Sequence, residues 1–146
     1  MNINELMSKH YFQKFKKSDR SSFKYWYYHW KAFNLVAYYL NVWKFKYLFH
    51  DFEKPWLKLF LPYEKVQKIH RKYNAHHIPK LTDKPKKVDW EAAVIDWECS
   101  RFTKIDAPMT AYETYQYFMK NRGDRYDLLM IDDNVPQILE QFGLNG

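Results

Sequence analysis

The sequence predicts an all-α fold, a compact single-domain bundle of six or seven helices. Apolar residues recur at intervals of three and four along most of the chain, and no segment shows sustained alternation of apolar and polar residues. The 146 residues include only three Gly, too few for a glycine-rich phosphate loop or for the tight turns of a β-sandwich. With 47% hydrophobic and 21% aromatic residues, the chain can fill the core of one domain.

Two helices are expected in the first 40 residues. A short amphipathic helix is predicted from about Ile3 to Lys16, within a basic segment. Ser21 or Ser22 can cap the next helix, which runs from Phe23 to about Leu40 without Gly or Pro. This second helix is apolar on nearly all sides, which is typical of a central helix.

Two further helices are expected in the middle of the chain, over residues 43–53 and 63–74. Pro55 limits the first of them and Pro62 precedes the second. The segment 78–87 contains two Pro and four Lys, which indicates a solvated loop.

The last third of the chain is expected to form three helices. Asp89 is the predicted N-cap of a helix that reaches about Lys104. Pro108 and Thr110 introduce a helix over residues 111–121, which Gly123 closes.

The last predicted helix is short. Asp133 or Asn134, with Pro136, begins it and Gly143 ends it. These elements divide the expected single domain, residues 1–146, into three parts: a basic N-terminal arm at 1–21, a helical core at 22–122 and a C-terminal helix at 123–146.

The charge and cysteine content indicate the partners and the compartment. The chain has 24 Lys and Arg against 17 Asp and Glu, a net charge of +7, which favours anionic partners such as nucleotides or nucleic acid. The single cysteine, Cys99, cannot form an internal disulfide, and we interpret it as a small buried core residue. The longest apolar run, 33–43, is shorter than the roughly 20 residues of a membrane span. We expect a cytoplasmic protein without membrane contact.

Two further expectations follow from composition. The 19 Lys against five Arg, with abundant Asn, Ile, Tyr and Phe, indicate an AT-rich genome, bacterial or phage. The high aromatic content is compatible with a homodimer that buries part of the surface.

Histidines and two carboxylates form the most informative pattern of the sequence. His50 is followed directly by Asp51. On a helix, Asp96 shares a face of small residues with Ala92, Ala93, Cys99 and Ser100, and a carboxylate buried there needs a cation or hydrogen-bond donors. The ordered set of candidate metal ligands is His29, His50, Asp51, His70, His76, His77 and Asp96.

This ordered set resembles the HD-domain superfamily of metal-dependent phosphohydrolases, and within it a group of short bacterial and phage HD-like proteins. The similarity covers roughly residues 25–105. The stretches that carry it are His29-Trp30-Lys31, Leu48-Phe49-His50-Asp51-Phe52-Glu53-Lys54, His70-Arg71-Lys72-Tyr73-Asn74-Ala75-His76-His77 and Ile95-Asp96-Trp97.

The resemblance implies an HD-like helical core and a mono- or dinuclear metal centre. One ion, of Fe, Mn, Co, Ni, Zn or Mg, is held by the set that names the superfamily: His29, His50, Asp51 and Asp96. Asp51 then bridges to a second ion, held by His70 and by His76 or His77. The chain departs from the usual spacing, because His50 follows His29 by only 21 positions and Asp96 follows His77 by only 19. This departure weakens the match at the second ion more than at the first.

The implied activity is hydrolysis of a phosphoester, in a nucleotide or another small phosphorylated substrate. Divalent ions activate a water molecule for attack on phosphorus. Lys54 matches the lysine of an HD-x-x-K motif, and Arg71, Asn74 and Arg101 are further candidates for substrate binding. Glu53 is a candidate proton shuttle, and Asp51, Glu53 and Lys54 form the expected catalytic group.

Two other functions fit the same sequence. A similar ligand order serves a few di-iron oxygenases that resemble HD phosphohydrolases. A non-enzymatic module could instead bind nucleic acid or protein through its basic arm and the aromatic run 25–30, since aromatic side chains stack on bases. The same aromatic run is also typical of core packing.

Overall fold

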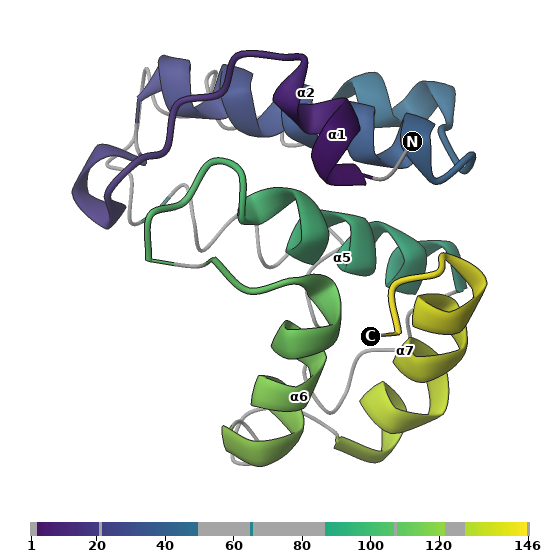
Figure 1. Ribbon diagram of the computed structural model, residues 1–146. Coiled ribbons are helices and arrows are strands. Elements are labelled where there is room, and N and C mark those ends of the chain that lie inside the picture. The colour runs from purple at the N-terminus through teal and green to yellow at the C-terminus, as the bar shows by residue number, and fades with distance from the viewer. Residues whose placement is uncertain are drawn as a thin grey trace. The chain divides into compact units, whose positions relative to one another are not determined.

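The computed structural model describes residues 3–20, 22–49, 65, 87–106, 108–121 and 128–145. Within these ranges the chain forms five α-helices and two short 3-10 helices, and no strand (Figure 1). The predicted all-α class is therefore confirmed, while the total of six or seven helices and the HD-like bundle stay predictions. No helix in the described part of the chain has the length and apolar character needed to cross a membrane.

The chain divides into two compact units. The first contains the described residues of Met1–Tyr73 together with Cys99–Pro108, and the second contains those of Asn74–Glu98 together with Met109–Gly146. Helix α5 (Lys87–Ser100) begins in the second unit, and its last two residues belong to the first. The organisation as one domain, with parts at 1–21, 22–122 and 123–146, stays a prediction.

Helix α1 (Ile3–Ser8) is shorter than the predicted helix over 3–16. The chain beyond it is extended, and Phe15 forms an isolated parallel bridge with Lys104. The Phe15 N–H donates to the Thr103 carbonyl at 2.8 Å, and the Ile105 N–H donates to the Phe15 carbonyl at 3.2 Å. Because these backbone groups pair across the chain, they are not available to a helix.

Helix α2 (Phe23–Tyr39) confirms the predicted long helix and supplies much of the core of the first unit. Its N-cap is Ser22, whose hydroxyl accepts the Tyr25 N–H at 3.1 Å. It ends in a Schellman motif at Asn41, a residue with φ of 60°. The Asn41 N–H donates to the Tyr38 carbonyl, and the Val42 N–H donates to the Ala37 carbonyl, both at 3.0 Å.

Within the segment predicted as a helix over 43–53, residues 45–49 form a 3-10 helix, η2 (Phe45–Phe49), and residues 50–53 lie outside the described residues. Side chains of α2 and of the turn that follows it hold this segment. The Asn34 amide donates to the carbonyls of Trp30 and Tyr47, both at 3.0 Å, and accepts the indole N–H of Trp43 at 2.8 Å. The Trp30 indole donates to the Leu48 carbonyl at 2.8 Å. A second 3-10 helix, η1 (Lys17–Asp19), precedes α2.

Helix α5 differs from its prediction at both ends. It begins at Lys87, so Asp89 is not the N-cap but lies in the first turn, where a carboxylate interacts favourably with the helix dipole. It ends at Ser100 rather than Lys104, because turns follow and Lys104 takes part in the bridge to Phe15.

Helix α6 (Ala111–Asn121) confirms the helix predicted over 111–121. Thr110 and Glu113 form a capping box at its start: the Thr110 hydroxyl accepts the Glu113 N–H at 3.2 Å, and the Glu113 carboxylate accepts the Thr110 N–H at 3.1 Å. The buried carboxylate of Glu98 accepts the Ala111 N–H at 2.9 Å. Gly123, the predicted end of the helix, lies outside the described residues.

Helix α7 (Leu128–Gln141) begins earlier than predicted, so Asp133 and Asn134 do not start it and Pro136 lies inside it. Its buried residues are Ile131, Val135, Ile138 and Leu139. This apolar face begins before Pro136, and its burial outweighs the loss of one backbone hydrogen bond. Gly143 ends the helix as predicted and has a φ of 70°. It forms a Schellman motif, in which the Leu144 N–H donates to the Leu139 carbonyl at 2.8 Å.

Candidate metal centre

His29 is a buried polar side chain on α2, with 4% of its surface exposed. It lies one helical turn after Tyr25, and the two rings stack with centroids 5.7 Å apart and planes inclined by 23°. Stacking and burial fix the orientation of the imidazole. A buried imidazole requires polar partners, and one of them is Cys99.

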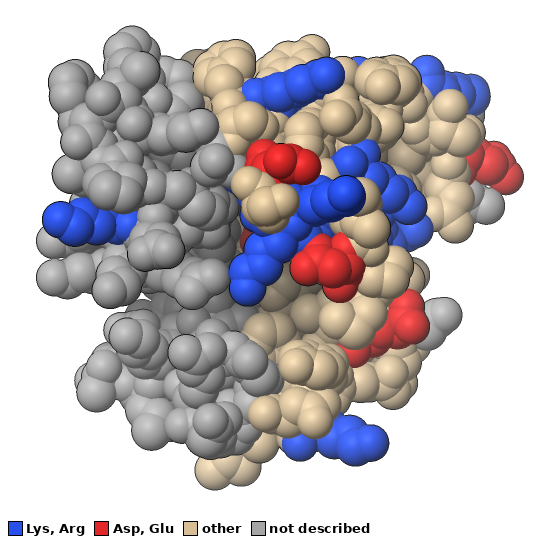
Figure 2. Space-filling model, turned by 90° about the vertical axis from the view of Figure 1, so that its left-hand side faces the viewer, with Lys and Arg blue, Asp and Glu red and all other residues tan. Residues whose placement is uncertain are grey.

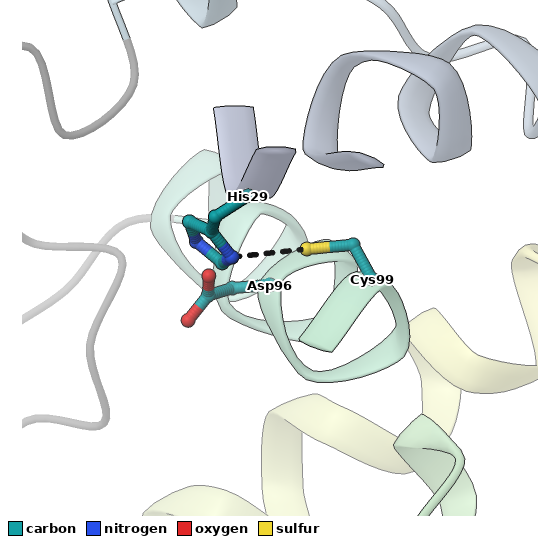
Figure 3. A group of neighbouring side chains, drawn as sticks. All are labelled: His29, Asp96 and Cys99. Carbon is teal, nitrogen blue, oxygen red and sulfur yellow. Dashed lines mark hydrogen bonds between the residues drawn. The ribbon is translucent and has the colours of Figure 1, made fainter. Parts of the chain in front are cut away.

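Cys99 lies in the last turn of α5 and is fully buried. Its Sγ atom is 4.0 Å from Nδ1 of His29 (Figure 3). The two residues belong to the same compact unit. The burial expected of Cys99 is therefore confirmed, and its thiol faces an imidazole nitrogen.

Asp96 precedes Cys99 by three residues on α5, so the two side chains lie on one face of this helix. The small-residue face predicted from the sequence is present: Ala92, Ala93, Cys99 and Ser100 are buried, and Asp96 is half-buried. One possible ligand atom from each of His29, Asp96 and Cys99 lies within 4.8 Å of the others (Figure 3). In the described part of the chain this is the one group of three such side chains.

Two of the predicted ligands, His29 and Asp96, lie among the described residues. The other candidates lie outside the described residues: His50, Asp51, Glu53, Lys54, His70, Arg71, Asn74, His76 and His77. Their roles stay predictions.

Arg101, a candidate for substrate binding, directly follows α5 and is half-buried. Its guanidinium carbon lies 4.3 Å from the centroid of the Phe102 ring, a cation-π contact. This contact occupies one face of the guanidinium and leaves its role toward a phosphate a prediction.

The aromatic run at the start of α2 has a buried and an exposed side. Tyr25 is buried in the core, whereas Tyr27 is 43% exposed. Trp30 stacks on both Trp26 and Tyr27, with centroids 6.2 Å apart in each pair. Core packing therefore accounts for one side of the run, and the other side is exposed.

Sequence reasoning missed two polar residues of α5. Cys99 is expected in the core alone, and its spacing of three from Asp96 shows only that the two side chains share a face of the helix. Glu98 was not singled out, and it caps α6 from within the core. No local pattern in the sequence indicates that partner, because it depends on how α6 packs.

Comparison of the chain with protein-family models, with curated proteins and with solved structures found no match. The resemblance to the HD-domain superfamily therefore rests on the residues quoted for it.

Proposed function

We propose that this protein is a metal-dependent phosphohydrolase that acts on a nucleotide or another small phosphorylated substrate. The observation that carries the proposal is the ordered set of histidines and carboxylates in the sequence, whose first member, His29, is buried on α2 and whose last member, Asp96, lies on the buried face of α5. His50 and Asp51 complete that set in the proposal, and His70 with His76 or His77 hold a second ion.

The donors fit a divalent ion. An imidazole and a carboxylate are ligands that first-row transition metals accept, and the burial of His29 keeps water from competing for it. The Trp30 indole, next to His29 on α2, also donates to the carbonyl of Leu48 in η2.

The residues of the chain have distinct roles in the proposed reaction. A bound divalent ion supplies a water of lowered pKa and neutralises charge on the phosphoryl oxygens. Lys54, Arg71, Asn74 and Arg101 bind and orient the phosphate, because guanidinium and ammonium groups donate charged hydrogen bonds to its oxygens. Glu53 moves a proton to or from the reacting water or leaving group.

Charge supports a small phosphorylated substrate. The net charge of +7 attracts anions. Both signs of charge are visible on the face drawn in Figure 2, so this face is not the purely basic surface that nucleic-acid backbones favour.

The first experiment measures metal content by elemental analysis of the full chain, beside His29→Ala, Asp51→Ala and Asp96→Ala. We expect a transition metal in the purified or reconstituted protein and its loss in all three variants. His10→Ala is the matched control, because His10 is exposed and lies outside the ligand set. Retention of full metal content in both Asp51→Ala and Asp96→Ala contradicts the proposed centre.

Activity is then measured with p-nitrophenyl phosphate and bis(p-nitrophenyl) phosphate, with oxygen uptake recorded in parallel. Hydrolysis should fall by more than about 100-fold in the ligand variants, since even changes in the shell around metal ligands cost 10- to 100-fold. Oxygen uptake that requires iron, without hydrolysis, favours the oxygenase instead. No metal and no hydrolysis, with nucleic-acid binding lost on charge reversal at Lys14, Lys16 and Lys17, favours the binding module.

A further inference from the structure

We infer that Cys99 is a thiolate ligand of the centre, which makes the site selective for Zn²⁺, Fe²⁺ or Co²⁺ over Mg²⁺. The inference rests on the proposed function, because it assumes that His29 and Asp96 bind an ion. It adds a ligand that the HD-like set does not contain and names the class of metal that the site takes.

The spacing of the two atoms is close to that of ligands on one ion. A tetrahedral ion with bonds of about 2.3 Å to sulfur and about 2.0 Å to nitrogen holds these atoms roughly 3.5 Å apart. The Sγ of Cys99 and the Nδ1 of His29 are 4.0 Å apart. A shift of about half an ångström, well within the reach of a side-chain rotation, therefore brings both atoms to coordinating distance.

The position of Cys99 on α5 supports the same assignment. On the face that carries Asp96, the neighbouring buried residues Ala92 and Ala93 offer no donor. Cys99 is one turn from Asp96 and directs its sulfur toward the His29 ring (Figure 3). An ordinary buried cysteine packs against apolar groups, whereas this thiol has an imidazole nitrogen and a carboxylate within 4.8 Å.

Charge balance favours the thiolate form when an ion binds. Binding of M²⁺ releases the thiol proton to solvent, and a sulfur–metal bond forms in place of the S–H bond. The thiolate joins the carboxylates in supplying negative charge to the centre, and the imidazoles add neutral donors. Because thiolate is a soft ligand, it favours transition metals over the hard ion Mg²⁺.

The test is a titration of the full chain with Co²⁺, followed by absorption spectroscopy. A thiolate on Co²⁺ gives an intense charge-transfer band in the near ultraviolet, which carboxylate and imidazole ligands do not give. Cys99 is the single cysteine of the chain, so any such band comes from this residue. We expect the band in the wild type. Zn²⁺ should displace Co²⁺ and abolish the band, whereas Mg²⁺ at an excess of about three orders of magnitude should leave it unchanged.

Cys99→Ser and Cys99→Ala should lose the band and bind Co²⁺ at least about tenfold more weakly. Ser100→Ala is the matched control: it alters the next buried residue of α5 and should keep the band. Circular dichroism checks that each variant is folded. If Cys99→Ala is unfolded, the test is the presence of the band in the wild type and its loss in Cys99→Ser.

Two results overturn the inference and separate it from the proposed function. Co²⁺ binding with hydrolysis but without a charge-transfer band shows that a metal centre exists and that Cys99 is not its ligand. Absence of both Co²⁺ binding and hydrolysis in the folded wild type removes the proposed function together with the inference.

Discussion

Tyr115 of α6 and Asp132 of α7 form a hydrogen bond of 2.5 Å between hydroxyl and carboxylate. Burial, this bond and the charge of Asp132 raise the pKa of Tyr115 from 10.0 to about 12. Because the pKa of Tyr115 is higher in the folded than in the unfolded protein, its protonated hydroxyl contributes fully to stability below pH 10. This contribution is lost as pH rises from 10 to about 12. The bond therefore stabilises the second unit at neutral pH and ceases to do so in strong base.

The variant Tyr115→Phe should lower the free energy of unfolding by less than about 1 kcal/mol near neutral pH, because the bond is solvent-accessible. The difference from the wild type should shrink as pH approaches 12. Urea unfolding at a series of pH values measures both effects. Tyr117→Phe is the control, since it removes an exposed hydroxyl from the same helix. If the difference in unfolding free energy between wild type and Tyr115→Phe stays constant across the pH series, the raised pKa is not that of Tyr115.

At the scale of single residues, the sequence predicted the candidate site in part. The spacing of small residues around Asp96 placed this carboxylate on a buried face correctly, because helical periodicity alone determines which residues share a face. The contact of Cys99 with His29 could not be predicted in the same way. It depends on the packing of side chains from distant parts of the chain, and a cysteine has no sequence signal that separates a ligand from a core residue.

At the scale of elements, α2 is determined largely by its own sequence. Ser22 accepts the N–H of Tyr25 at 3.1 Å and donates to the carbonyl of Asp19 at 3.0 Å. Ser22→Ala should lower the free energy of unfolding by about 1 kcal/mol, the usual cost of losing an N-cap. Urea unfolding measures it, and Ser22→Asp should retain most of the stability because aspartate also caps.

Ser18→Ala is the matched control for this prediction, since Ser18 is an exposed serine in the neighbouring η1. It should change stability by less than about 0.5 kcal/mol, as surface substitutions do. Equal losses in Ser18→Ala and Ser22→Ala would show that the cap contributes nothing specific.

Helix ends set by tertiary contacts were harder to predict than those set by caps. Thr110 at the start of α6 and the glycine that ends α7 are local signals, and both are recognisable in the sequence. The early end of α1 depends on the bridge from Phe15 to Lys104. The early start of α7 depends on the burial of Ile131 and Val135, which outweighs the presence of Pro136. Such non-local interactions leave no mark in a short window of sequence.

At the scale of the whole molecule, helix α5 contributes residues to both compact units. A boundary between independent domains falls in a linker, but here it falls within a helix, between Glu98 and Cys99. Glu98, the last residue of α5 in the second unit, caps α6, and the next residue contacts His29 in the first. Fraying of this turn removes contacts from both units.

We therefore expect the full chain to unfold in one cooperative transition, as the predicted single-domain organisation requires. Each unit contains tryptophans, so fluorescence and far-ultraviolet circular dichroism should give coincident urea curves. Ser22→Ala in the first unit and Thr110→Ala in the second each remove an N-cap, worth about 1 kcal/mol. In a cooperative chain either variant shifts the whole curve by a similar amount. Two separate transitions, with each variant shifting only one of them, would show that the units are independent despite the shared helix.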